Sequence, residues 1–301
     1  MASVKTKAKK FNPSAINNAS QRRTVRKFGI FFLIPTFVAF CIGFVWPFIQ
    51  GIYLSFFRFK TLKFREFVGF SNYVTAFKDE SFTHAFWFTV AFTIVSVVII
   101  NLAAFFIAFA LTKKLRGSTI FRTVFFIPNL IGGIVLGYIW KILLDGVIMY
   151  FLNSTLALNA TYGFWGLVIL TCWQQIGYMM IIYIAGLQNV PGEYIEAAHI
   201  DGANGWQMLK HITLPCVMPS ITICTFLTLT NSFKLFDQNL ALTAGKPFDQ
   251  TEMLALNIYN SFYENVTSMG PGQAKAVIFF VVVVVIALAQ LYFTRSKEVQ
   301  A

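Results

Sequence analysis

The stretch Asn189–Pro215, NVPGEYIEAAHIDGANGWQMLKHITLP, interrupts the hydrophobic C-terminal half of the chain with polar and charged residues. Its first part favours a helix, because Pro191 suits the first helical position and the acidic Glu193 and Glu196 lie near the positive end of the helix dipole. Gly202 then supplies a residue that can end this helix. The first half of the stretch therefore predicts one short helix followed by a turn.

The rest of the stretch predicts a second short helix. Asn204 and Gln207, three residues apart, give a capping-box signal for its start. Trp206, Leu209 and Ile212 then form an apolar stripe along it. From periodicity alone, an amphipathic loop lying on a membrane surface is an equally good interpretation.

A longer residue pattern favours a more specific interpretation. Two parts of the stretch resemble the EAA loop of permease subunits in binding-protein-dependent ABC importers. One is ITLP at residues 212–215, and the other consists of Glu196, Ala197, Ala198, Asp201, Gly202 and Ala203. In that family the loop forms the cytoplasmic coupling helix, which docks in a cleft of the ATP-binding subunit and passes ATP-driven closure to the membrane domain. The resemblance implies that Glu196 faces the ATPase and that Gly202 makes the bend between two short helices.

The composition predicts a polytopic membrane protein. Of the 301 residues, 57% are hydrophobic, which is more than soluble domains normally carry, and only 12% are charged. The net charge of +12 would suit nucleic acid, but the basic residues lie beside hydrophobic spans rather than along one amphipathic face, so nucleic acid is not an expected partner. Four cysteines without C-x-x-C spacing predict free thiols: Cys41, Cys172, Cys216 and Cys224.

Hydropathy predicts an all-α fold with six membrane spans. The spans are expected at residues 28–57, 84–112, 121–144, 163–187, 214–236 and 274–293. Residues 1–27 form a basic tail, 28–294 the permease domain with its coupling loop at 189–213, and 295–301 the C-terminus. The first span is too long for a signal peptide and is expected to be retained.

The distribution of charge predicts the orientation of these spans. With six spans, fifteen Lys and Arg residues fall on one side of the membrane and six in the loops on the other. Because basic residues accumulate on the cytoplasmic side, both termini are expected in the cytoplasm and the protein in the cell membrane.

Two further segments extend the resemblance toward carbohydrate-type permeases. FVGFSNYVTAF at residues 67–77 is similar to the segment before the family's second helix, within an expected outer loop at 58–83. FRTVFFIPNLIGGIVLGYIW at residues 121–140 resembles the third conserved helix, where Gly132, Gly133 and Gly137 would let another helix approach closely. The polar outer segment at 237–273 only partly follows the family pattern, departing at Lys246 and Phe248.

No residue pattern predicts catalysis by this chain. There is no Walker A sequence, so ATP and Mg²⁺ are expected in a separate subunit and no cofactor in this one. The histidines have no metal-ligand spacing, which predicts no metal site. An intramembrane enzyme is disfavoured, because no nucleophile and base share a helix face.

Two helix faces are candidates for a substrate path, because polar residues inside spans are costly unless they face protein or water. They are Thr171, Gln174, Gln175 and Tyr178 on the fourth span, and Thr228, Asn231 and Ser232 on the fifth. In the related maltose importer the sugar contacts come from these two helices, and Trp173 and Tyr178 could add stacking surfaces. Alternatively, these groups bond only across helices, at roughly 0.6 to 2 kcal/mol each.

Other polar residues have simpler interpretations. Lys234 and Asp237, three residues apart, are expected to pair as a surface salt bridge rather than to line an entrance. Asn101 and Asn129 are expected to serve helix packing.

The sequence therefore predicts the permease subunit of an ATP-driven sugar importer. Its expected partners are a second homologous permease, two ATP-binding subunits, an extracytoplasmic sugar-binding protein and the lipid bilayer. An importer for glycerol phosphate, a polyol or an acidic oligosaccharide is the first alternative, although an anion would need cations in the path, for which only Lys141, Lys234 and Lys275 are available. An ATP-independent channel or secondary carrier is the second.

Overall fold

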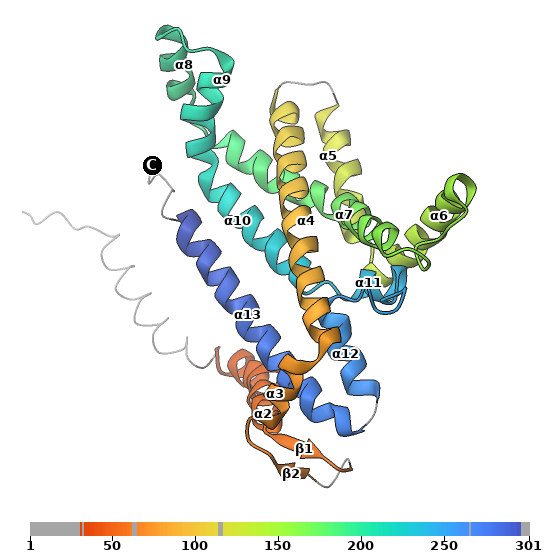
Figure 1. Ribbon diagram of the computed structural model, residues 1–301. Helices are drawn as coiled ribbons and strands as arrows, with labels where there is room; N and C mark the ends of the chain where they lie inside the picture. The colour runs from red at the N-terminus through yellow and green to blue at the C-terminus, as the bar shows by residue number, and fades with distance from the viewer. Residues whose placement is uncertain (1–30, 32, 62–64, 114–116, 265, 296–301) are drawn as a thin grey trace, which may run out of the picture. The chain divides into compact units, whose positions relative to one another are not determined.

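The computed structural model describes residues 31, 33–61, 65–113, 117–264 and 266–295 (Figure 1). The predicted basic tail at 1–27 and nearly all of the predicted C-terminus at 295–301 lie outside these residues. Six described helices are long and apolar enough to cross a membrane, and the all-α fold is confirmed. They are Leu33–Leu54, Glu80–Thr112, Gly133–Leu152, Ala160–Gln188, Gly205–Phe233 and Val266–Arg295.

The chain divides into two units, Met1–Leu54 and Ser55–Ala301. In the first, the described helix changes to a π-turn, η1 (Cys41–Val45), before α2 (Trp46–Leu54). Pro47, at the second position of α2, cannot donate a backbone hydrogen bond, and it lies two residues after the π-turn, where the pattern of helical hydrogen bonds is already altered.

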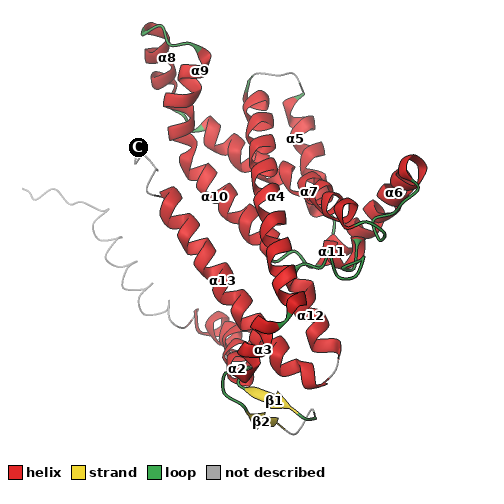
Figure 2. Cartoon of the chain, viewed as in Figure 1, coloured by secondary structure: helices red, strands yellow, loops and turns green. Residues whose placement is uncertain are grey.

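The second unit begins with a hairpin and a short helix in the segment predicted as an outer loop. Strands β1 (Phe57–Phe59) and β2 (Arg65–Phe67) are antiparallel, and α3 (Ser71–Lys78) follows them. The Asn72 side chain fastens this region by donating to the carbonyls of Ser55 and Phe57 at 2.8 and 2.9 Å. Figure 2 shows these two strands among helices.

The core lies where α4 (Glu80–Thr112), α7 (Ala160–Gln188) and α10 (Leu214–Phe233) pack together. Asn101 joins all three helices: its Nδ2 donates to Thr228 Oγ1 at 2.9 Å, and its Oδ1 accepts from Tyr183 OH at 2.8 Å. The helix-packing role predicted for Asn101 is confirmed.

The predicted third span at 121–144 was wrong, because the chain breaks inside it. Helix α5 (Ser118–Phe126) ends in a 3₁₀ turn, η2 (Ile127–Leu130), and the long apolar helix is α6 (Gly133–Leu152). Pro128 lacks the N–H that would continue α5, and Gly132 is extended at φ −60° and ψ 140°. Instead of one span, α5 and η2 pack on α7, while α6 packs on α11 (Asp237–Leu242).

The small residues of α6 explain its contact with α11. A Cβ at Gly133 would lie 2.7 Å from the Asp237 Cβ, and one at Gly137 would lie 2.6 Å from the Ala241 Cβ. The predicted close approach is confirmed at these two glycines. It was wrong for Gly132, where an added Cβ would meet no atom of the described residues within 4 Å.

The polar stretch folds as a helix, a turn and the start of a long helix. Helix α8 (Gly192–Ile200) follows Pro191, which is its extended N-cap rather than its first residue. After the turn, α9 (Gly205–Met208), η3 (Leu209–Thr213) and α10 form one continuous helix, so the second predicted helix is not separate. The predicted capping box is present, with Asn204 and Gln207 each accepting from the other's backbone at 2.9 Å.

The segment predicted as a polar outer loop at 237–273 is also folded. It contains α11, α12 (Leu254–Glu264) and η4 (Val266–Ser268), and α13 (Met269–Arg295) begins before its end. Asn239 anchors the connection between α11 and α12, because its Nδ2 donates to Thr251 O at 2.8 Å and its Oδ1 accepts from Met253 N at 2.9 Å. Figure 1 shows α8 and the hairpin at opposite ends of this second unit.

Candidate functional site

A polar cavity of about 310 Å³ opens where η2, α7, α10 and α11 meet. Its lining is rich in amide groups and contains one basic and one acidic residue. The lining residues are Asn129, Gln174, Gln175, Asn231, Lys234, Leu235, Phe236, Asp237 and Gln238. Three of the seven residues predicted for a substrate path are among them: Gln174, Gln175 and Asn231.

Gln174 of α7 forms hydrogen bonds to two other segments, one after η2 and one in α11. Its Nε2 donates to the carbonyl of Ile131 at 3.2 Å, and its Oε1 accepts from Gln238 Nε2 at 2.7 Å. Ile131 has an extended backbone directly after η2, outside any helix. The break in the third predicted span therefore places that carbonyl beside α7.

Gln175 places a buried side-chain oxygen with unused hydrogen-bonding capacity in the cavity lining. It is 6% exposed, and its buried Oε1 accepts no hydrogen bond from any described residue. Buried amide oxygens are normally paired, so this atom is suited to accept from a hydroxyl group of a bound solute. Asn129, expected to serve helix packing, also lines the cavity.

Lys234 and Asp237 both line the cavity, and the salt bridge predicted between them was wrong. Among the described residues, no ion pair within 4 Å joins them. Helix α10 ends at Phe233, with Lys234 as its C-cap, and α11 begins at Asp237. The three-residue spacing that pairs side chains within one helix does not apply across this turn.

The other predicted path residues do not line this cavity. Thr171, Thr228 and Ser232 are fully buried, and Thr228 is engaged by Asn101. The hydroxyl groups of Thr171 and Ser232 have no hydrogen-bond partner among the described residues. Thr228 therefore fits the alternative in which these polar groups only form hydrogen bonds between helices.

The aromatic residues expected to stack on a sugar lie elsewhere. The Tyr178 ring packs against Phe126 at 6.4 Å between centroids, and Trp173 packs against Trp140 at 5.5 Å. The aromatic ring in the cavity wall belongs to Phe236, a residue that no sequence pattern singled out. Its position directly before α11 shows only once the turn after α10 is known.

The second candidate site is the turn between α8 and α9. Gly202 has a left-handed backbone at φ +74° and donates to His199 O at 3.1 Å, while Ala203 N donates to Ala198 O at 2.9 Å. Ala198 is buried and Ala203 half-buried, whereas the remaining predicted coupling residues are exposed: Glu196, Ala197, Asp201 and Gly202.

Two large apolar side chains stand out from the same turn. Ile200 is 86% exposed and Trp206 is 70% exposed. Both lie within five residues of the exposed Asp201 in the sequence, and large exposed apolar side chains beside acidic ones are typical of a docking site for another protein. Among the described residues no group of three His, Cys, Asp or Glu side chains could hold a metal ion.

A model of one protein family matches residues 100–299, and its description is "Binding-protein-dependent transport system inner membrane component". The chain is 42% identical over 277 residues to a "Probable starch degradation products transport system permease protein" of Thermoanaerobacterium thermosulfurigenes, with 89% of this chain and 94% of that protein covered. It is 30% identical over 288 residues to a "Multiple sugar-binding transport system permease protein" of Streptococcus mutans, with 92% and 99% covered.

A solved structure shows the same fold. One chain of a bacterial alginate ABC transporter, in complex with an alginate pentasaccharide-bound periplasmic protein, matches with a TM-score of 0.77. The match covers 93% of this chain and 99% of that chain at 19% identity.

Proposed function

This chain belongs to the family of binding-protein-dependent transport system inner membrane components, and we propose that it forms, with a second homologous permease, the path of a neutral oligosaccharide through the cell membrane. It is a multi-pass membrane subunit of a transport system. In our proposal two ATP-binding subunits dock at the cytoplasmic end, one of them on α8 and its turn, and a sugar-binding protein docks at the opposite, extracytoplasmic end. ATP and Mg²⁺ are held by the ATP-binding subunits.

The cavity lined by Gln174, Gln175 and Asn231 carries this proposal. Amide groups both donate and accept hydrogen bonds, so they match the hydroxyl groups of a sugar in either role. The unpaired Oε1 of Gln175 supplies an acceptor that the fold itself leaves unused. The cavity lies between the two helices on which the sequence predicted the path.

The charges of the cavity favour a neutral solute over an anionic one. Lys234 and Asp237 both line the cavity, so the lining carries no net charge. Lys275 is bound to Asp79, and Lys141 is not among the lining residues. An importer for glycerol phosphate or an acidic oligosaccharide would need cations without a compensating acid, so it is the weaker candidate.

Two of the relatives at 30% identity or more support a neutral cargo, since their names refer to starch degradation products and to multiple sugars. The likeness to the alginate transporter, at 19% identity, supports the fold and not an acidic cargo. We therefore propose linear glucose oligosaccharides as the substrate class.

In the proposed mechanism, ATP binding closes the ATP-binding subunits, and the turn around Glu196 moves with them. The membrane domain then opens outward and sugar passes from the binding protein into the cavity. Such alternating access requires that ATP and the loaded binding protein each bind one global state more tightly than the other.

Purification from native membranes in a mild detergent tests this proposal. We expect a second permease and an ATPase to co-purify, and we expect neutral glucose oligosaccharides with their binding protein to stimulate ATP hydrolysis. Stimulation by glycerol phosphate or alginate fragments alone would replace the proposed cargo. A chain that purifies alone and moves solute without ATP would instead be a channel or secondary carrier.

A further inference from the structure

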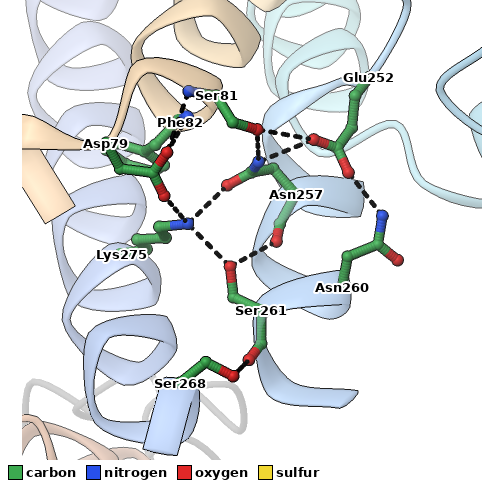
Figure 3. A network of polar contacts seen from close by, with 9 residues as sticks. All are labelled: Asp79, Ser81, Phe82, Glu252, Asn257, Asn260, Ser261, Ser268 and Lys275. Carbon is green, nitrogen blue, oxygen red and sulfur yellow. Dashed lines mark hydrogen bonds and ion pairs between the residues drawn. The ribbon is translucent and has the colours of Figure 1, made fainter. Parts of the chain in front are cut away.

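Lys275 lies near the start of α13 and is buried, at 4% exposure. Its Nζ donates to three side chains: Asp79 Oδ2 at 2.7 Å, Ser261 Oγ at 2.8 Å and Asn257 Oδ1 at 3.1 Å (Figure 3). Three acceptors use the full donor capacity of an ammonium group. The buried charge of Lys275 is therefore fully satisfied within the fold.

Asp79 joins this charge to the start of α4. Its Oδ1 caps the helix by accepting from the backbone N–H of Ser81 at 3.0 Å and of Phe82 at 3.4 Å. Burial alone would raise the pKa of Asp79, but the hydrogen bond and the charge of Lys275, together with the backbone N–H groups of Phe82 and Ser81, outweigh it and hold the pKa below its usual range. The Asp79–Lys275 ion pair thus fixes α13 against α4.

The same network forms hydrogen bonds with residues on one face of α12. Asn257 and Ser261 are four residues apart, so they point the same way from the helix. Just before α12, Glu252 accepts from Asn257 Nδ2 at 2.7 Å, Asn260 Nδ2 at 2.5 Å and Ser81 Oγ at 3.4 Å. Figure 3 shows these groups converging between α4, α12 and α13.

The opposite side of α12 supports the cavity. Tyr259, two residues after Asn257, carries a ring that packs against the Phe236 ring at 5.1 Å between centroids. Phe236 lines the cavity beside Gln174 and Gln175. Helix α12 therefore lies between the buried ion pair and the aromatic wall of the cavity.

We propose that Lys275 is a positioning residue for the sugar path, which holds α12 so that Tyr259 supports Phe236 in the cavity wall. This inference rests on the proposed function, because it requires that sugar contacts Phe236. Stability alone does not account for the network, since apolar residues of similar volume often replace a buried ion pair without loss of stability. What the ion pair adds is one fixed direction and register of α12.

The test measures equilibrium binding of a linear glucose pentasaccharide to the purified complex of both permeases and the ATPase, without binding protein. We expect Lys275→Met to weaken binding about tenfold while the complex still assembles and keeps its basal ATPase activity. Lys275→Arg, which keeps the charge and the donors, should restore binding to within about twofold of the wild type. Lys60→Met is the matched control, because Lys60 forms an ion pair with Glu66 on the surface, and it should leave binding unchanged.

A double-mutant cycle shows whether Lys275 acts through the cavity wall. In a Phe236→Leu complex, Lys275→Met should weaken binding less than twofold further. Independent, multiplicative effects of the two substitutions, or unchanged binding in Lys275→Met, would overturn the positioning role.

If Lys275→Met does not assemble, Ser261→Ala removes one acceptor and keeps the ion pair. It should weaken binding about threefold, and unchanged binding would count against the proposal in the same way. A wild-type complex that binds no neutral sugar would refute the proposed function itself, whereas failure of Lys275→Met alone would leave that function standing.

Discussion

The α-carbon of Gly177 packs directly against the backbone carbonyl of Phe125, and no room remains for a side chain between them. This contact joins α7 to α5 close to the point where Pro128 ends the helical run. The close approach brings η2, and with it Asn129 and the carbonyl of Ile131, to the cavity. One glycine thereby sets the position of one cavity wall.

Gly177→Ala should destabilise the protein by about 1–3 kcal/mol, because the added Cβ collides with backbone rather than with a movable side chain. The thermal unfolding midpoint of the purified complex measures this effect. Gly146→Ala is the matched control: Gly146 lies in α6 and has open space around its Cα, so it should unfold at the wild-type temperature or slightly above. Equal midpoints for the two variants would contradict the close contact.

Gln175→Leu should weaken sugar binding about tenfold, because it removes the unpaired acceptor that lines the cavity. Thr171→Val changes a residue of the same helix face that is buried away from the cavity, and it should leave binding unchanged. Isothermal titration of the purified complex with a glucose oligosaccharide compares the two. Weakened binding in Thr171→Val with none in Gln175→Leu would place the path on the other polar groups of α7.

Gly202→Val should weaken attachment of the ATP-binding subunits, because a left-handed backbone costs an L-residue about 1–2 kcal/mol and a β-branched one more. Glu196→Ala should uncouple ATP hydrolysis from sugar without affecting membrane insertion. Gly205→Ala, at the start of α9 with open space around it, should behave as the wild type. Co-purification of the ATPase, followed by sugar-stimulated hydrolysis, measures these effects; normal values in the first two variants would remove the coupling role.

Glu252 predicts a pH dependence of stability. Burial raises its pKa, although hydrogen bonds from Asn257 and Asn260 oppose the shift. The folded state then binds the proton more tightly than the unfolded state. Protonation of Glu252 therefore stabilises the folded state at low pH, and this stabilisation is lost as the pH rises through the raised pKa. The unfolding midpoint of the wild type should therefore fall relative to that of Glu252→Gln as the pH rises above about 4.3, the usual value for Glu.

Two other carboxylates separate this effect from general acid sensitivity. The pKa of Asp79 is lowered, so its stabilisation is lost only as the pH falls through that lowered value, below the window of Glu252. Glu66 is exposed and its pKa is lowered by its hydrogen bond with Lys60, so Glu66→Gln should track the wild type throughout the higher window. If the wild type instead became more stable relative to Glu252→Gln as the pH rises, the pKa of Glu252 would be lowered in the folded state and the prediction would be wrong.

The number of spans could be predicted from the sequence, because long apolar runs bounded by polar segments identify membrane helices without tertiary information. The third span was misplaced although its signals were visible: Pro128 removes a backbone donor, and Gly132 and Gly133 favour a break. Hydropathy averages across such a break, and only the packing of α5 on α7 shows which half continues. The folded segments around α3, α11 and α12 are short and polar, so hydropathy gave no sign of them.

The cavity could be predicted only in part for a similar reason. Helical periodicity correctly grouped Thr171, Gln174, Gln175 and Tyr178, but a shared face does not show what lies opposite each residue. Gln174 and Gln175 meet η2 and α11, whose positions depend on a helix break and a turn. Lys234 and Phe236 were misjudged or missed for the same reason, since their direction is set by the turn between α10 and α11.

The unbroken helix from Gly205 to Phe233 contains 29 residues, and at 1.5 Å per residue it is about 43 Å long. One end begins at the turn beside Gly202, and Asn231 lies in the cavity wall near the other. A tilt of roughly ten degrees about the first end would carry the second sideways by about 7 Å, given that length. The helix can therefore work as a lever. In the proposed mechanism, a small tilt at the coupling turn would move the cavity wall at Asn231 by about the width of a sugar ring.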